Sequence, residues 1–317
     1  MMDGATLQST VKPGFARRWT VPNFMREMAK NKVCYLLIAP FMILFFVFTV
    51  LPVAISLGLS FTSFNVLETP QWVGLDNYFR LFLGDQVFIR SIGNTMVLAL
   101  AVGPIGYLLC LLIAWLVNEL RPRIRAIVTL VFYAPAVSGN IFLVWATLFS
   151  SDEFGWLNGF LIRHGFERGP IRWLEDPRFM MPIVIGVALW ASLGISFLTF
   201  IAGLQGIDKT YYEAAAVDGL RNRWQELWFV TLPMMKPQLV FGAVMSISAS
   251  FGIGSITAAL AGMPSMDYAV HTIMNHLELY GGVKFEMGYA SAIATLLFIL
   301  MIGSNKFIQR LISKVGK

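Results

Sequence analysis

Residues 91–118 read SIGNTMVLALAVGPIGYLLCLLIAWLVN and contain no Asp, Glu, Lys, Arg or His. A helix needs about 20 mostly apolar residues to cross the hydrocarbon core of a bilayer, and this stretch is long enough. All 24 Lys and Arg and all 18 Asp and Glu lie outside this run and five others of similar character. The pattern predicts an all-α, polytopic membrane helical bundle of about six transmembrane helices. The other runs are 33–60, 126–149, 181–203, 238–258 and 287–305.

The composition agrees with a protein whose main solvent is lipid. Hydrophobic residues make up 57% of the 317-residue chain and charged residues only 13%, against about a quarter in an ordinary soluble domain. Cys34 and Cys110 both fall in apolar runs, so we expect packing residues and no disulfide or metal site. The first run is too long for a signal-peptide core and lacks a small-residue cleavage site, so we interpret it as a retained span.

The basic residues predict the orientation of the chain. Seventeen of the 24 Lys and Arg lie in the N-terminal segment, the loops after the second and fourth runs, and the C-terminal tail. Cytoplasmic loops carry such an excess, which places both termini in the cytoplasm. The division is a cytoplasmic segment 1–32, a transmembrane domain 33–310 and a basic tail 311–317. Because the net charge of +6 follows this alternation, it is an orientation signal, and we do not expect nucleic acid as a partner.

Several kinds of chemistry are missing from the sequence. The six runs contain no ionisable residue of the kind that forms proton relays, which argues against an ion-coupled pump or a membrane enzyme. There is no G-x-x-x-x-G-K-[ST] phosphate loop and no metal-ligand cluster, so no cofactor is expected in this chain. His164, His271 and His276 fall in predicted outside loops, where we expect surface or interfacial residues.

The fifth run, 238–258, is rich in small and hydroxylated residues. Gly242, Ser246, Ser250, Gly254 and Ala258 recur every four residues and would form one stripe on a helix. Such a stripe can permit close helix packing, and it can also line a polar cavity. The two interpretations do not exclude each other. Candidate residues for lining a translocation pathway are Asn140, Trp190, Ser246, Ser250, Gly254 and Ser255.

The longest cytoplasmic connection, 204–237, has internal order of its own. Thr210 and Glu213 have capping-box spacing, which predicts a short helix from about Tyr211. Asp218-Gly219 predicts a turn, and a second helix is expected from about Asn222. Pro233 and Pro237 are expected to end it. The sequence therefore predicts a helix–turn–helix elbow with a small-residue surface, suited to docking into a partner. Glu213 either serves that docking or only caps its helix.

This connection resembles the EAA loop of bacterial ABC importer permease subunits. The match is E-A-A-x-x-x-G followed by L-P, at Glu213, Ala214, Ala215, Gly219, Leu232 and Pro233, with Tyr212 and Asp218 in the same loop. The likeness extends over about 33–310 and is closest to the first permease subunit of carbohydrate-uptake systems of the maltose and glycerol-phosphate type. It includes Trp72 to Tyr78, Ser91 to Thr95 and Met287 to Ala292. One departure is Asp208, where the family usually has proline.

The resemblance implies a non-catalytic permease subunit of an ATP-driven importer for a carbohydrate or polyol, in the bacterial inner membrane. It further implies a second homologous permease subunit, a cytoplasmic ABC ATPase dimer that binds ATP and Mg, and an extracytoplasmic solute-binding protein. The loop residues named above, Tyr212 to Pro233, would couple the ATPase to alternating access. The alternative is an ATP-independent channel or facilitator for a small polar solute, and a membrane scaffold or enzyme subunit is the weaker third possibility.

Overall fold

The computed structural model describes residues 32–138 and 142–312, which divide into two compact units, Met1–Ile55 and Ser56–Lys317. Within those described ranges the chain is helical, and its only β-type pairing is an isolated bridge between Thr62 and Trp72. The all-α prediction is therefore confirmed. The segment 1–31, the tail residues 313–317 and Asn140 lie outside the described residues.

The described part of the first unit is one apolar helix. It comprises α2 (Lys32–Phe45), a π-helical turn η1 (Phe46–Val50) and α3 (Leu51–Leu59), which continues into the second unit. The helix is 28 residues long, enough to cross a bilayer. Pro40 lies inside α2, a position that a membrane helix tolerates because neighbouring groups can satisfy the freed backbone carbonyl.

Three further helices of the second unit are long and apolar enough to span a membrane. They are α5 (Gln86–Asn118), α9 (Pro177–Ala191) together with α10 (Ile195–Gln205), and α17 (Met287–Ile312). Two bent pairs have the same composition: α6 (Pro122–Val137) with α7 (Phe142–Leu148), and the helical segment Arg223–Met234 with α14 (Lys236–Phe251). The described residues thus hold four spans, or six if each bent pair counts, in agreement with the predicted number.

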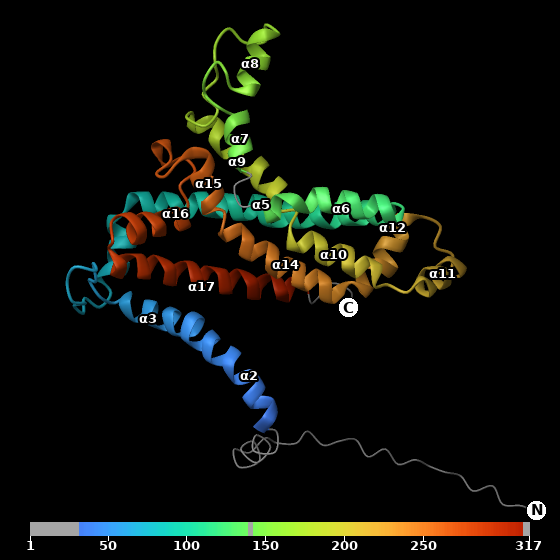
Figure 1. Ribbon diagram of the computed structural model, residues 1–317, viewed down its shortest axis with the longest axis horizontal. Helices are drawn as coiled ribbons and strands as arrows, with labels where there is room; N and C mark the ends of the chain where they lie inside the picture. Colours follow the sequence, from blue (N-terminus) through green and yellow to red (C-terminus); the bar gives the residue numbers. More distant parts are fainter. Residues whose placement is uncertain (1–31, 139–141, 313–317) are drawn as a thin grey trace, which may run out of the picture. The chain divides into compact units, whose positions relative to one another are not determined.

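Shorter helices connect these spans, and Figure 1 labels several of them. The elbow 204–237 contains four of the short helical segments, which gives it more structure than an ordinary loop. In chain order the short elements are α4 (Asp76–Phe79), η2 (Arg80–Gly84), α8 (Trp156–Arg163), α11 (Lys209–Val217), α12 (Arg223–Glu226), η3 (Leu227–Thr231), α13 (Leu232–Met234), α15 (Gly254–Ala261), η4 (Met266–Tyr268), α16 (Ile273–Glu278) and η5 (Leu279–Val283).

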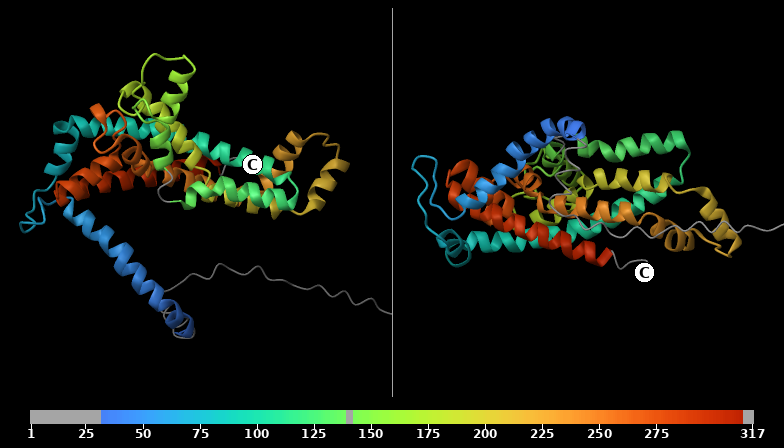
Figure 2. Two further views of the ribbon diagram at one scale, coloured as in Figure 1. Left: turned by 45° about the horizontal axis from the view of Figure 1, so that its top comes forward. Right: turned by 90° about the horizontal axis from the view of Figure 1, so that it is seen from below.

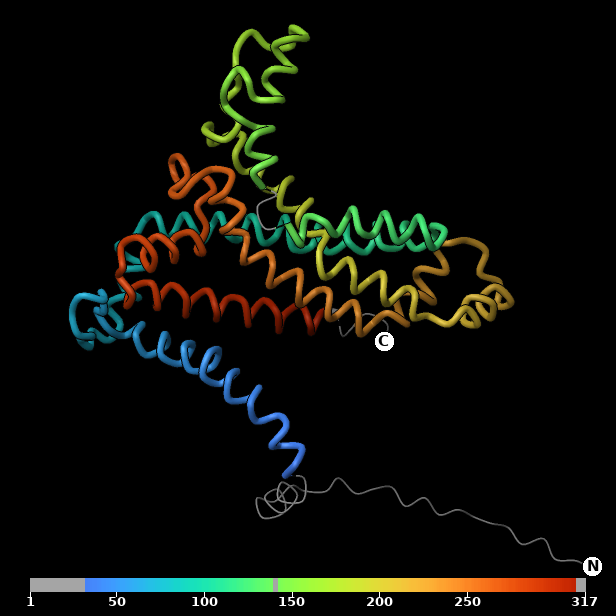
Figure 3. Tube along the Cα trace, in the orientation of Figure 1, coloured from blue at the N-terminus to red at the C-terminus, as the bar shows by residue number. Residues whose placement is uncertain are grey.

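The centre of the second unit is a layer of packed helices, α5, α10, α14 and α17, which lie side by side in Figures 1 and 2. Phe197 and Phe200 of α10 are fully buried there. Gly242 of α14 leaves room for the Phe200 ring, because a β-carbon at this position would lie 2.6 Å from a ring atom. The elbow with α11 lies at one end of this layer and α16 lies toward the other, as the chain trace in Figure 3 shows.

The first loop of the second unit is organised around Asn77. Its side-chain amide donates to the carbonyl oxygens of Ser60 and Thr62 at 2.9 and 2.8 Å, and Tyr78 donates to Ser60 Oγ at 2.8 Å. Gly74 has φ +62°, a conformation that favours glycine. The motif at 72–78 thus holds the first loop together through hydrogen bonds from Asn77 and Tyr78 to Ser60 and Thr62.

The structure corrects the prediction of one continuous helix over 238–258. The helix α14 ends at Phe251, and a separate helix α15 begins at Gly254. Gly254 packs against α16, since a β-carbon there would lie 2.7 Å from Met274 Cβ. Thr257 donates to Asn275 Oδ1 at 2.7 Å. Contacts with α16 therefore hold α15 apart from α14, and the stripe of small residues is divided between two helices.

The expectation that all three histidines lie at the surface is also wrong for two of them. His164 is exposed, but His271 and His276 are each only 1% exposed. They are buried because the segment after α15 folds back against the first turns of α5 and α17. Charge and position in the sequence do not reveal that packing.

Candidate coupling site and translocation pathway

The first arm of the elbow is α11, and its start differs from the sequence prediction. The N-cap is Asp208, whose carboxylate accepts from the backbone N–H of Thr210 at 3.0 Å. Hydrogen bonds from Thr210 lower the pKa of the exposed Asp208 carboxyl below its usual range. A capping box between Thr210 and Glu213 is therefore not formed. Asp208 replaces the proline of the family pattern with a residue that begins the helix equally well.

The end of α11 follows the prediction for Gly219. This residue has φ +97°, and its N–H donates to the Ala216 carbonyl at 3.2 Å. The N–H of Leu220 donates to the Ala215 carbonyl at 3.0 Å, which completes a Schellman motif. Such an ending satisfies two helix carbonyls and fixes the direction in which the chain leaves, so the tip of the elbow is rigid.

Two contacts on the inner side of α11 attach it to the rest of the elbow. Tyr212 Oη lies 3.0 Å from Thr231 Oγ1, and Thr231 is 2% exposed. Ala215 is the buried alanine of the A-A-A run, while Ala214 and Ala216 are exposed. The helix therefore buries one side and presents small side chains on the other.

The second arm begins where the sequence predicted. Asn222 caps α12 by accepting from the Gln225 N–H at 2.9 Å. Arg223 forms ion pairs with Glu226 at 2.7 Å and with Glu119, at the end of α5, at 3.1 Å. These acceptors raise the pKa of the Arg223 guanidinium, the Glu226 hydrogen bond contributing most. The arm is thereby joined to the end of a spanning helix.

Pro233 does not end the second arm, which corrects the prediction. It lies inside the helical segment Arg223–Met234, just after the π-helical turn η3, and the chain bends at Met235 instead. Pro237 lies in the first turn of α14, where its missing N–H costs nothing. The segment Arg223–Met234 meets α14 at 82°, so the elbow passes directly into a spanning helix. Leu232 is half-buried and Pro233 exposed.

A cavity of about 660 Å³ opens between the elbow and the turn that joins α5 to α6. Glu213 lines it, is exposed, and makes no hydrogen bond or ion pair with any described residue. Since Asp208 caps the helix and Glu213 lies in its second turn, the capping interpretation of Glu213 no longer holds. Asp218 is likewise exposed, at the C-cap. The charged residues around the cavity are Glu119, Arg125, Lys209, Glu213, Arg223 and Glu226.

A second cavity of about 340 Å³ lies between α5, α6, α10 and α14, beside the break between α9 and α10. Ser246 and Ser250, two of the pathway candidates, both line it, as do Tyr133, Ser192 and Ser196. Ser196 donates to the Gly242 carbonyl at 3.1 Å and Ser246 to the Gly103 carbonyl at 3.0 Å. The serines therefore join neighbouring helices and also present hydroxyl oxygens to a cavity that no charged side chain of the described residues lines.

Trp190, Gly254 and Ser255 do not line this cavity. Trp190 packs its ring against Trp145 with 5.3 Å between centroids. Gly254 is buried against α16, and Ser255 is exposed on α15. Asn140 falls outside the described residues. Of the described candidates, only Ser246 and Ser250 line this cavity.

Sequence reasoning missed the buried polar residues at the other end of the bundle. Asp85, His271 and His276 form a chain of hydrogen bonds, and Asn158 holds together the segment 150–173. These residues lie in loops or short helices, where no periodicity marks a buried position. The only sequence feature that could have indicated burial is weak: these amide and imidazole side chains lie in segments with few charges.

A bundle of bent and broken spanning helices, with a capped elbow at one end and an uncharged cavity between the helices, has the architecture of a membrane permease. The chain belongs to the family of binding-protein-dependent transport system inner membrane components, whose match covers residues 104–315. It is accordingly a permease subunit of an ABC transporter in the inner membrane.

Similar proteins support the assignment over most of the chain. A probable ABC transporter permease of Bacillus subtilis, YesP, is 34% identical over 87% of this chain and 89% of its own length. The arabinooligosaccharide permease AraP of the same organism is 29% identical over 86% of each chain. The sn-glycerol-3-phosphate permease UgpA of Agrobacterium fabrum is 29% identical over 90% of this chain and 96% of its own.

A solved structure shows the same fold. It is a bacterial ABC transporter involved in import of the acidic polysaccharide alginate, 24% identical, with a TM-score of 0.76 over 93% of this chain and 100% of the other. The helical membrane fold is thereby confirmed. The family match and the relatives AraP and UgpA confirm the resemblance to sugar permeases.

Proposed function

We propose that this chain forms half of the translocation pathway of an ATP-driven importer for a carbohydrate or polyol. Its relatives AraP and UgpA transport arabinooligosaccharides and sn-glycerol-3-phosphate, which supports that solute class. The chain would pair with a second homologous permease subunit. ATP and Mg would bind to a separate cytoplasmic ATPase dimer. An extracytoplasmic solute-binding protein would deliver the solute, as the alginate transporter's complex with a periplasmic protein suggests.

The observation that carries the coupling part of the proposal is the state of α11. Both ends of this helix are capped, Tyr212 holds it to Thr231, and the second arm passes without an intervening loop into α14. Glu213 is exposed and unpaired among the described residues. A rigid lever that carries a free carboxylate can meet a basic group on an ATPase and transmit its motion to a spanning helix.

The test is the reversal of charge at Glu213 in the assembled transporter. We expect Glu213→Lys to reduce solute uptake by tenfold or more, because a cation would replace the anion at the interface, while membrane insertion stays normal. Glu213→Gln should retain part of the activity. The matched control is Glu167→Lys, an exposed glutamate outside the elbow, which should leave uptake unchanged.

Two outcomes would contradict the proposal in different ways. Normal ATP-dependent uptake by Glu213→Lys would show that this carboxylate does not couple the ATPase. Uptake that persists without ATP, or purification of the chain without an ATP-binding subunit, would favour the ATP-independent facilitator instead. Purification with mass spectrometry of the associated proteins decides between them.

A further inference from the structure

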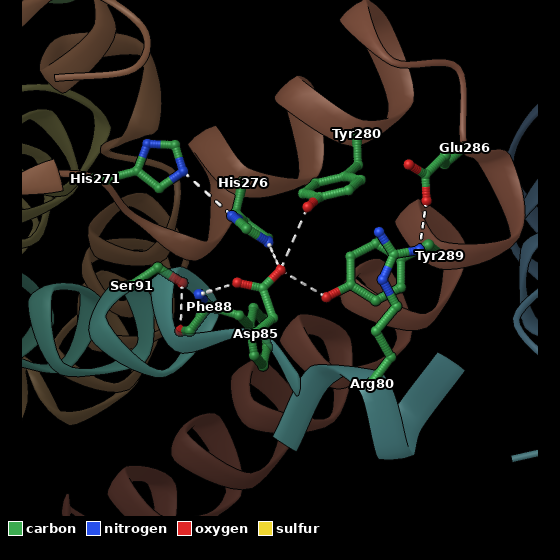
Figure 4. A network of polar contacts seen from close by, with 9 residues as sticks. All are labelled: Arg80, Asp85, Phe88, Ser91, His271, His276, Tyr280, Glu286 and Tyr289. Carbon is green, nitrogen blue, oxygen red and sulfur yellow. Dashed lines mark hydrogen bonds and ion pairs between the residues drawn. The ribbon is translucent and has the colours of Figure 1, made fainter. Parts of the chain in front are cut away.

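A cluster of buried polar side chains lies at the end of the bundle away from the elbow, and Figure 4 shows it at close range. It joins segments that are far apart in sequence: η2 and the residue before α5, the segment 271–286, and the first turn of α17. Arg80 and Glu286 lie at its exposed edge, and Phe88 contributes its backbone N–H. The residues drawn in Figure 4 are Arg80, Asp85, Phe88, Ser91, His271, His276, Tyr280, Glu286 and Tyr289.

Asp85 is the acceptor at the centre of the cluster. One carboxylate oxygen caps α5 by accepting from the Phe88 N–H at 2.9 Å. The other accepts from His276 Nε2 at 3.1 Å, from Tyr289 at 2.8 Å and from Tyr280 at 3.4 Å. Burial alone would raise the pKa of Asp85, but the hydrogen bonds to Phe88, Tyr289 and His276 hold it below its usual value. Asp85 is therefore an anion at neutral pH.

The direction of the hydrogen bonds follows from this charge. If His276 Nε2 donates to Asp85, the neutral ring has a lone pair on Nδ1, which can accept from His271 Nε2 at 3.3 Å. His271 Nδ1 then also carries a lone pair, and this buried atom has no hydrogen-bond partner among the described residues. Burial lowers the pKa of His271 to about 4 and also lowers that of His276. Both rings are thus neutral near pH 7.

The charged groups near His276 are Asp85 before α5, Arg80 of η2, and Lys284 and Glu286 after η5. Arg80 of η2 pairs with Glu286 at 2.5 Å and lies 4.1 Å from the centre of the Tyr289 ring. Lys284 lies 3.8 Å from the centre of the Tyr280 ring. Among the described residues, Tyr268 and Asn94 contact His271 without charge: the Tyr268 ring centroid is 5.3 Å away, and Asn94 donates to the His271 carbonyl at 3.0 Å. The charge of Asp85 favours a proton on His271 from a greater distance. The two nearby cations oppose a proton on His276, and only Asp85 favours one.

Protonation is incompatible with this arrangement. Both nitrogens of a protonated imidazole are donors, so a charged His276 could no longer accept from His271. His271 would have to move its proton to Nδ1, where it has no acceptor, and burying an unpaired donor is costly. A second proton would place two cations beside one carboxylate.

We propose that Asp85, His276 and His271 form a proton-sensitive latch, which fastens α16 and η5 to the starts of α5 and α17 at neutral pH and loosens in acid. We call the segment of α16 and η5 closed when it is packed against α5 and α17, and open when it has separated from them. Above about pH 6.5, both histidines are neutral in the open and in the closed state, so protons do not favour opening. As the pH falls below that value, the open segment takes up protons that the closed one excludes, and opening becomes easier. The loosened part is the end of α16 with η5, because Asn275 and Thr95, which do not titrate, hold the start of α16.

The experiment is hydrogen–deuterium exchange of the full chain in its purified transporter, between pH 8 and pH 4.5, corrected for the intrinsic pH dependence of exchange. We expect the protection of amides at 276–286 to fall by at least about tenfold across this range, because burial lowers the pKa of His271 to about 4 and the closed segment excludes protons that the open one binds. Peptides from α10 should keep their protection. The measurement does not depend on which solute is carried.

Variants separate the latch from general acid damage. His276→Gln replaces the ring with an amide that can donate to Asp85 and accept from His271 but cannot titrate, so the acid response at 276–286 should become clearly smaller. If that variant does not insert, His271→Gln serves the same test. His164→Gln, at the exposed histidine, should respond as the wild type does. The proposal fails if the wild type keeps full protection at pH 4.5, or if the glutamine variants respond as the wild type does.

Discussion

Gly288 in the first turn of α17 lies directly against the backbone of Thr62. Its N–H donates to the Phe64 carbonyl at 2.8 Å, and a β-carbon on Gly288 would collide with the Thr62 carbonyl oxygen. Backbone atoms cannot move aside as a flexible side chain can. Only glycine at position 288 lets the start of α17 pack this closely against the backbone of the first loop.

Gly288→Ala should therefore destabilise the protein by about 3 kcal/mol, the upper part of the usual range for overpacking. The measurement is the apparent melting temperature of the purified protein in detergent. Gly303→Ala is the matched control on the same helix, since nothing lies within 4 Å of a β-carbon there. It should be neutral or stabilising by up to about 1 kcal/mol, because alanine favours helix over glycine. Equal melting temperatures for the two variants would refute the argument.

Coupling through the elbow should depend on the contact between Tyr212 and Thr231. Tyr212→Phe removes one hydrogen bond, worth about 1 kcal/mol, and should loosen α11 without exposing new apolar surface. We expect ATP hydrolysis to continue while less solute is transported per ATP. The matched variant is Tyr211→Phe, whose side chain is 51% exposed on the same helix and which should behave as the wild type. An unchanged transport-to-hydrolysis ratio in Tyr212→Phe would mean that this contact does not transmit the motion.

The segment 150–173 should depend on Asn158, which is 1% exposed. Its amide nitrogen lies within 3.1 Å of the carbonyl oxygens of Ser150, Asp152 and Ile171. Its Oδ1 accepts from the Ile171 N–H at 3.1 Å and from Trp173 Nε1 at 2.8 Å. Asn158→Ala should cost about 3 kcal/mol locally, because several buried groups lose their partner at once.

Limited proteolysis checks this expectation, since cleavage within 150–173 should become much faster than in the wild type. Glu167→Ala, at an exposed position of the same segment, should leave the cleavage rate unchanged. A rate that did not change in Asn158→Ala would show that other contacts hold the segment.

The uncharged cavity near Ser246 gives a prediction about transport. Ala249 lines it and is exposed, so Ala249→Trp can enter the protein without a steric clash in the packed core and would fill much of the 340 Å³. We expect uptake to fall by tenfold or more while the subunit still assembles with its partners. Ile299→Trp, at an exposed position of α17, is the control for a bulky residue added to a spanning helix. Normal uptake in Ala249→Trp would move the pathway away from this cavity.

The sequence by itself determined the class of fold, the spans and the elbow. Charge-free runs must be placed in lipid wherever the helices pack, so 91–118 could be recognised as a spanning helix without any knowledge of its neighbours. The roles of Gly219 and Asn222 could also be predicted from the sequence. A turn after a short helix and a cap before the next helix depend only on a few adjacent residues. For the same reason the loop motif around Glu213 could be matched to a family.

Tertiary structure alone decided the features that depend on distant partners. Pairing with Asn275 and Met274 interrupts the fifth run at Gly254, although the run reads as one helix. Burial of His276 requires Asp85, which is 191 residues away in the chain. The free energy of such contacts comes from side chains that sequence spacing does not bring together. The polar clusters of this permease were therefore visible only once the helices were packed.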